Sequence, residues 1–438
     1  MTIKHLYPDA WPTLNLDFAN QLALDPRITF TRSSIGTYVD KNGIMQIAQD
    51  DEPRFDHDPV TGESLGLLIE ESRTNFEPYS DLSTGWSFMP AQGSNSTAPD
   101  GSNNAVELNG GNAGGTGNII VTKNITLTTA GAYVLSFFVK KPADSIAAFT
   151  YLEARSFSGS SSGGKLFFDW STNDWSSWTQ DNGSAYILPV KEYANGWFRL
   201  SIKLTLVSSD LSGSIRTGIS DQAGNASTGT FSTVNKILVW GAQLEEGPYP
   251  TSYIPTAGST VTKAVDLATI RGNQWLDIWT SNNQSIFAEG TINYTVDYTT
   301  YPVNLTGPNL YRMDGQSSIA KVWYSYVENT YRGTVDGSSG GGGTVDLFHA
   351  VTQKTGTFKS CLTLDTNNDR IISAWNTVLS NKDDGANYII NTYRQGNYPG
   401  ITIGGAASNE RGAWNGTVAR IAIYNVAMPN EQLQALTA

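Results

Sequence analysis

Short runs of β-branched and aromatic residues recur along most of this chain, with turn-forming residues between them. The clearest run is residues 199–206, where apolar side chains occupy every even position. A two-residue period places alternate side chains on opposite faces of a strand, whereas a helix needs a period of 3.6. The run therefore predicts a half-buried strand, and its repetition along the chain predicts an all-β protein.

The composition agrees with many strands joined by tight turns. Of the 438 residues, 43 are glycine, 11% are aromatic and only 16% are charged. At roughly 100 to 200 residues per domain, this length corresponds to two or three compact units. We therefore expect two tandem jelly-roll or β-sandwich domains, preceded by an N-terminal segment of strands and turns.

Shifts in sequence character give the expected domain boundaries. Residues 1–79 form an N-terminal segment that packs on the first sandwich, and residues 80–258 form that sandwich, a jelly roll. The polar, Thr-rich passage at residues 256–262 interrupts the apolar periodicity and marks the end of this domain. A linker is expected to follow at residues 259–284. Residues 285–438 are then expected to form the second sandwich.

Individual strands can be placed from the apolar runs. The first sandwich is expected to contain strands at residues 105–108, 118–121, 133–139, 165–168, 197–204 and 236–240. The second is expected to contain strands at residues 285–294, 318–327, 358–364, 371–375, 400–404 and 417–424. Trp197 and Trp240 lie within apolar strands and are assigned to the core.

Local signals add a hairpin, a buried strand and one helix. Asn42-Gly43 lies between two short apolar runs, and its preferred turn has positive φ at both central positions. Residues 65–69 are expected to form a buried strand. A helix is predicted only at residues 429–436, where Leu433 and Leu436 share one face.

Charge and cysteine content exclude several classes of protein. The formal net charge of −12 argues against binding nucleic acid, which depends on Lys and Arg contacting phosphates. Neither a signal sequence nor an apolar run long enough to span a membrane is present, so we expect no membrane insertion. Cys361 is the only cysteine, which excludes an intrachain disulfide and fits folding in a reducing cytoplasm.

Carboxylates raise the question of catalysis. Glu63, Glu70 and Glu71 could suggest a glycosidase pair, which needs two carboxylates roughly 5–9 Å apart across a cleft. Neighbouring residues of a strand point to opposite faces, so Glu70 and Glu71 do not meet this requirement. The histidines lack the spacing of a zinc site or a catalytic triad. We therefore predict no catalytic residues and no cofactor.

One segment has the spacing of a calcium loop. Residues 365–369 read Asp-Thr-Asn-Asn-Asp, but Arg370 stands where such a loop needs glycine, and the twelfth position lacks glutamate. A polar hairpin turn is the preferred interpretation. Calcium bound elsewhere by carbonyls and scattered carboxylates remains open, so the metal content is left unknown.

Aromatic residues beside turn residues are candidates for stacking on sugar rings, because turns lie at the surface. The same residues could instead cover a sandwich edge or form a subunit contact, since aromatics are also enriched at interfaces. The glycan-binding candidates are Trp175, Trp178, Trp323, Tyr326, Tyr393 and Tyr398.

Three sets of motifs resemble parts of a modular protein widespread in tailed phages and prophages. The N-terminal set comprises residues 16–20, 25–32, 36–40, 53–56 and 62–75. Residues 195–199 and 238–255 resemble carbohydrate-binding-module jelly rolls of phage tail-fibre and head-fibre proteins. Residues 416–424 and 429–436 are similar to the last strand and terminal helix of concanavalin A-like or laminin-G-like domains.

This resemblance implies a bacteriophage virion structural protein, a tail-fibre, head-fibre or spike subunit used in host attachment. It implies contact with host surface polysaccharide, binding to other virion proteins through the N-terminal segment, and a homo-oligomer. The protein would reside in the virion, on head or tail, after assembly in the host cytoplasm. Glu70, Glu71 and Arg73 would form a structural cluster that closes the N-terminal segment onto the sandwich.

Two alternatives remain beside the fibre or spike subunit. The first is a capsid or tail decoration protein with a purely structural role. The second is a polysaccharide-degrading enzyme, which the absence of a recognisable catalytic motif disfavours.

Overall fold

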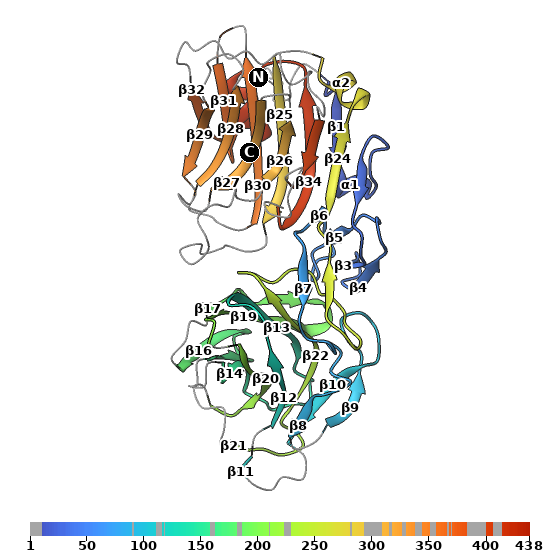
Figure 1. Cartoon of the computed structure of the whole chain (residues 1–438), viewed down its shortest axis with the longest axis vertical. Coiled ribbons are helices and arrows are strands. Elements are labelled where there is room, and N and C mark those ends of the chain that lie inside the picture. The colour runs from blue at the N-terminus through green and yellow to red at the C-terminus, as the bar shows by residue number, and fades with distance from the viewer. Residues whose placement is uncertain are drawn as a thin grey trace, which may run out of the picture.

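The structure of the protein is a computed structural model. It describes residues 11–89, 92–110, 116–117, 119–157, 163–181, 186–209, 211–222, 229–280, 283–292, 309–314, 318–325, 330–337, 344–350, 356–365, 368, 370–382, 400–405 and 414–438. Almost all regular structure in these residues is β-strand, which confirms the all-β prediction. They form two lobes placed end to end and joined by a narrower waist (Figure 1).

The first lobe is a sandwich of two facing sheets. One sheet contains β9 (Gln92–Ser96), β10 (Ala105–Asn109), β13 (Gly131–Lys140), β17 (Tyr186–Ile187), β18 (Lys191–Tyr193), β19 (Trp197–Leu206) and β22 (Lys236–Glu246). The other contains β8 (Ser87–Met89), β12 (Ile119–Thr126), β14 (Phe149–Arg155), β15 (Gly163–Asp169), β16 (Asp174–Asp181) and β20 (Ser212–Ser220). A short pair, β11 (Thr116–Gly117) and β21 (Gly229–Thr230), lies apart from them. Apolar side chains of both sheets form one core, with Phe137 and Leu200 from the first and Leu152 and Phe168 from the second.

The second lobe is also a two-sheet sandwich. One sheet contains β1 (Leu14–Asp17), β5 (Phe55–His57), β6 (Ser64–Ile69), β25 (Gln284–Ile292), β30 (Gly356–Asp365), β31 (Arg370–Trp375), β32 (Val378–Lys382) and β34 (Gly416–Tyr424). The other contains β2 (Thr29–Thr31), β24 (Leu267–Arg271), β26 (Asn309–Asp314), β27 (Ser318–Ser325), β28 (Thr330–Gly337), β29 (Thr344–Ala350) and β33 (Gly400–Ile403). Their shared core includes the fully buried Trp275, Trp279 and Trp414.

The N-terminal segment belongs to both lobes. Strands β1 and β6 both pair with β34, near the other end of the chain, and β2 pairs with β24. Strand β7 (Arg73–Asn75) pairs instead with β22 of the first lobe. The hairpin of β3 (Gly36–Val39) and β4 (Met45–Ala48) covers the outer face of the same sheet, where Val39 and Met45 join a cluster with Trp240 and Tyr253.

This arrangement corrects two expected boundaries. Residues 1–79 were expected to pack on the first sandwich, and they also supply strands to the second. Residues 259–284 were expected to be a linker, but they contain β23 (Val261–Lys263), β24 and α2 (Asn273–Ile278). Strand β23 pairs with β7, and β24 pairs with β2 and β33. The local sequence pattern did not reveal β23 and β24, because their partner strands lie more than a hundred residues away in the chain.

The predicted strand at residues 199–206 lies within β19, but it is not half-buried. Its polar face is covered as well, with Arg199, Ser201 and Lys203 all buried. Arg199 donates to the carbonyl oxygen of Thr251 at 2.6 Å and to the hydroxyl of Ser136. The loop after β22 and the β3–β4 hairpin cover this face, so both faces of the strand are interior.

Local predictions were mostly confirmed. The hairpin forms, but Asn42 lacks the expected positive φ, and only Gly43 has it, at 75°. The turn is longer because the Asp40 carboxylate accepts hydrogen bonds from the N–H groups of Asn42 and Ile44. The C-terminal helix α3 (Asn430–Leu436) buries Leu433 as predicted. Two short helices were missed, α1 (Phe18–Gln21) and α2.

Candidate functional site

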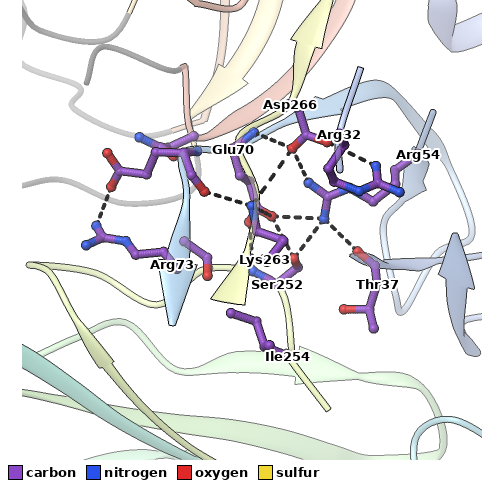
Figure 2. Close-up of polar contacts among 12 residues, drawn as sticks. Arg32, Thr37, Arg54, Glu70, Arg73, Ser252, Ile254, Lys263 and Asp266 are labelled. Carbon is purple, nitrogen blue, oxygen red and sulfur yellow. Dashed lines mark hydrogen bonds and ion pairs between the residues drawn. The ribbon is translucent and has the colours of Figure 1, made fainter. Parts of the chain in front are cut away.

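The waist between the lobes contains five buried charged side chains that come from distant parts of the sequence (Figure 2). Arg32 follows β2, Arg54 precedes β5, and Glu70 follows β6. Lys263 ends β23, and Asp266 precedes β24. Each is at most 5% exposed. We call these five residues the junction cluster.

Arg54 is the centre of the junction cluster. Its Nη1 lies 2.9 Å from Oε2 of Glu70 and also donates to the carbonyl oxygen of Thr37 and to the hydroxyl of Ser252. Its Nη2 forms an ion pair with Asp266. Because Thr37 and Ser252 belong to parts of the chain that pack on the first lobe, this one guanidinium holds elements of both lobes.

The two buried carboxylates have their oxygens filled by donors. Asp266 accepts from Nη1 of Arg32 at 3.1 Å and from the backbone N–H of Glu70 at 2.9 Å. Glu70 accepts from the backbone N–H of Ser252 at 2.7 Å and from its hydroxyl at 2.6 Å. The Nζ of Lys263 lies 3.8 Å from Oε2 of Glu70 and adds a positive charge to the cluster. Nε of Arg54 is the one buried donor of these five side chains without a hydrogen-bond partner, and the bonds to the two carboxylates hold the cluster in one geometry.

These contacts set the ionisation of the cluster. Burial alone would raise the pKa of Glu70, but the charges of Arg54 and Lys263 and the hydrogen bonds from Ser252 bring it to about 2. Burial lowers the pKa of Lys263, and the neighbouring carboxylates oppose this shift. Burial also opposes the charge on Arg54, but Asp266 and Glu70 outweigh it and raise the pKa of Arg54. Glu70 is therefore an anion throughout the neutral range.

Glu71 and Arg73 make a second connection beside the junction cluster. Glu71 pairs with Arg73 and accepts a hydrogen bond from the hydroxyl of Tyr249 at 2.7 Å. The backbone N–H of Glu71 donates to Oδ1 of Asn415 at 2.9 Å, and the amide of Asn415 donates to the Tyr249 hydroxyl. Tyr249 follows β22 of the first lobe, and Asn415 precedes β34 of the second. These residues therefore tie the lobes together a second time.

This geometry does not suit acid–base catalysis. A general acid must hold a proton near the working pH, and the low pKa of Glu70 prevents that. Glu71 is occupied by Arg73 and Tyr249, and Glu63 is exposed on the turn before β6. Among the described residues there is also no group of three or more His, Cys, Asp or Glu side chains placed to hold a metal ion.

The predicted glycan candidates are only partly visible. Trp175 is half-buried against the core of the first lobe, and its indole N–H donates to the carbonyl oxygen of Leu188 at 2.9 Å. It packs edge-on against Phe168. The side chains of the others lie outside the described part of the chain, and these residues are Trp178, Trp323, Tyr326, Tyr393 and Tyr398. The grouping of these six residues as a glycan site therefore stays a prediction.

Sequence reasoning named Glu70 of the junction cluster, and Glu71 and Arg73 beside it, but missed the other four members of the cluster. Arg32 and Arg54 lie in the phage-like stretches 25–32 and 53–56, which was a usable signal. Lys263 and Asp266 lie in a passage that looked like a linker, so nothing in their surroundings marked them as buried. Strands β30 and β31 pair as far as Asp365 and Arg370, and Asn368 is bonded to Asp365, whereas residues 366, 367 and 369 lie outside the described residues.

Comparisons with known proteins gave only distant structural likenesses. No family model and no curated relative matches the chain. The CBM40 of the Ruminococcus gnavus IT-sialidase aligns over 36% of this chain and 83% of its own, at 15% identity and a TM-score of 0.29. The NanB sialidase from Streptococcus pneumoniae (K499G mutant) aligns over 38% and 26%, at 10% identity and 0.29. A SAP-like pentraxin from Limulus polyphemus aligns over 35% and 69%, at 9% identity and 0.23. Likenesses of this size carry no argument about ligand or activity.

No helix in the described residues is long and apolar enough to cross a membrane.

Proposed function

We propose that this protein is a structural, non-catalytic subunit of a tailed-phage virion, of the fibre or spike type, that contacts host surface glycans. The observation that carries the structural role is the junction cluster, which fastens two β-sandwiches through buried ion pairs. The N-terminal motifs that resemble phage proteins supply Arg32, Arg54 and Glu70 to that cluster. Resemblance and geometry thus concern the same residues.

A rigid joint suits a protein that must hold a binding surface away from a particle. Domains joined by a plain linker move relative to each other unless their interface is large or tightly bonded. Here chain segments cross between the lobes and buried charges are paired at the crossing, so the two lobes are expected to move as one body. An appendage subunit needs this property, whereas a hydrolase needs a reactive cleft.

The sequence likeness to carbohydrate-binding modules also falls largely on the joint. Residues 238–255 include Trp240 and Tyr253, which are buried beneath the β3–β4 hairpin, and Ser252, which holds Glu70. These residues cannot stack on a sugar in the folded chain. A glycan contact must therefore use another surface of the protein.

Labelling of virions tests the main proposal. An antibody raised against the folded chain, viewed by electron microscopy on purified phage, should label a fibre, spike or other appendage at a fixed position. Absence of label on intact virions would refute the virion assignment. Uniform label over the head without glycan binding would favour the decoration alternative, and release of reducing ends from host polysaccharide would favour the enzyme.

Truncation is a poor substitute for labelling. Removing residues 1–75 would delete β1, β2, β5 and β6 from the second lobe and β7 from the first. Loss of virion incorporation after such a deletion would report misfolding as readily as loss of an attachment contact. A small C-terminal tag is the better handle for measuring the proposed homo-oligomer, because Ala438 is exposed.

A further inference from the structure

The waist also carries an open cleft of about 570 Å³. One wall consists of residues 22–24 and Phe55, of which Leu24 and Phe55 pack against the core of the second lobe. The opposite wall consists of Tyr38 and the hairpin turn at residues 40–42, which packs on the first lobe. Small-molecule sites usually measure roughly 300–1,000 Å³, so this cleft has room for a ligand.

Tyr38 presents its ring to the cleft because of its place in β3. Its neighbours Thr37 and Val39 face the first lobe, where the Thr37 hydroxyl donates to the carbonyl oxygen of Tyr253 and Val39 joins the aromatic cluster. Alternation along the strand directs Tyr38 to the other side, where it is only half-buried. Burial, together with the negative charges of Glu52 and Asp40, raises the pKa of Tyr38. Both carboxylates therefore lie near the phenol.

His57 supplies a buried polar atom in the wall of the cleft. The residue is 7% exposed and lines the cleft, and its Nδ1 lies 3.0 Å from the carbonyl oxygen of Val39. A carbonyl oxygen can only accept, so Nδ1 must carry the ring hydrogen. In the neutral imidazole the other nitrogen, Nε2, is then an acceptor.

The carboxylates at the cleft are held in place by the backbone. Asp40 accepts from the N–H groups of Asn42 and Ile44 and from the side chain of Gln46. Glu52 accepts from the N–H of Gln49 at 2.7 Å. Each carboxylate has about four acceptor positions, so Glu52 keeps capacity for a ligand, whereas the positions of Asp40 are taken within the hairpin and Asp40 contributes its charge. Groups fixed before binding lose little conformational entropy when they bind.

We propose that this cleft binds one or two rings of a neutral glycan, which deepens the proposed function and rests on its glycan contact. Two aromatic side chains, Tyr38 and Phe55, offer apolar faces to the C–H face of a sugar ring. The acceptors Glu52 and His57, with the negative charge of Asp40 beside them, match a ligand rich in hydroxyl donors. The cleft contains two carboxylates, Asp40 and Glu52, and one lysine, Lys41. This excess of negative charge disfavours an anionic sugar.

Binding of the full chain to an array of immobilised neutral and acidic oligosaccharides provides the test. Wild type should bind neutral members of the array in preference to sialylated or uronic ones. Tyr38→Ala removes a stacking face and Glu52→Lys reverses a charge at the rim, and each should weaken that binding by about tenfold or more. Glu63→Lys is the matched control, because Glu63 is an exposed carboxylate outside the cleft, and it should bind like wild type.

The outcomes separate this inference from the proposed function. Neutral-glycan binding that both variants retain would place the site elsewhere and overturn the inference, while leaving the glycan contact in place. Preference for acidic glycans would overturn the ligand class. Binding to no glycan would overturn both the cleft and the glycan contact, whereas the virion assignment depends on labelling alone. If Tyr38→Ala lowers the melting temperature, Glu52→Lys decides, because its side chain is exposed.

Discussion

Arg54 and Asp266 are 212 residues apart in the sequence and form an ion pair in which neither side chain is exposed. Asp266 also pairs with Arg32, so this carboxylate contacts two guanidinium groups, and Glu70 supplies a second carboxylate to Arg54. Breaking a buried pair is far more costly than losing a surface pair, because the remaining charge is left without compensation. The joint between the lobes therefore depends on individual charges that can be tested one at a time.

Asp266→Asn should destabilise the protein strongly. It removes the carboxylate from between Arg32 and Arg54 and should lower the free energy of unfolding by about 3–5 kcal/mol. Urea unfolding at neutral pH measures the change. Glu63→Gln, on an exposed turn, is the control and should change it by less than about 0.5 kcal/mol. A loss for Asp266→Asn no larger than that of the control would show that the junction cluster does not hold the lobes.

Acid should weaken the fold partly through Glu70. Its pKa is about 2 in the folded chain against an ordinary value of 4.5, so the ionised form stabilises the fold above pH 4.5. That contribution, about 3 kcal/mol, should disappear as the pH falls from 4.5 through 2. Urea unfolding over this range should therefore show a steeper loss for wild type than for Glu70→Gln, which has no carboxylate to titrate. Parallel curves would contradict the assignment.

Two glycines with positive φ should respond differently to alanine. At Gly66, in β6, an added Cβ would lie 2.3 Å from the carbonyl oxygen of Val418 in the paired strand β34. At Gly196, an added Cβ would meet nothing within 4 Å. Both substitutions strain the backbone by about 1 kcal/mol, but only Gly66→Ala should also disrupt strand pairing. Melting temperatures should rank wild type above Gly196→Ala and Gly196→Ala above Gly66→Ala, and the reverse order of the two variants would be inconsistent with this register.

Cys361 should be chemically silent in the folded protein. It is fully buried in β30, and burial raises the pKa of its thiol to about 12. Since the thiolate is the reactive form, a disulfide reagent such as DTNB should react only as fast as the chain unfolds. One equivalent should react at once in denaturant, because the chain has no other cysteine. Rapid reaction of the native protein would show that the second lobe opens locally.

Local sequence signals predicted the strands well and their partners poorly. The run at residues 199–206 and the turn at Gly43 depend on neighbours, and the chain forms a strand and a hairpin there. Pairing of β6 with β34 brings together residues about 350 positions apart, and no local period encodes such a contact. For the same reason β23 and β24 looked like a linker, since short strands become recognisable only once their partners are known.

The junction cluster shows a similar limit. Arg32 and Arg54 follow or precede short strands in a charged, proline-rich region, which is typical of surface turns. Their burial depends on segments that come about 200 residues later in the chain and that supply Ser252, Lys263 and Asp266. A sequence can suggest which residues matter here, but the compensation of each charge depends on the assembled geometry.

The position of β34 has a consequence for synthesis. This strand lies in the middle of its sheet, with β25 on one side and β1 and β6 on the other, although it comes about 350 residues after β6 in the chain. Contacts so distant in sequence form slowly. On the ribosome, the first strands of the second lobe must wait with unpaired edges while the rest emerges. A premature stop before residue 416 would leave that sheet split in two, and such open edges are prone to aggregation.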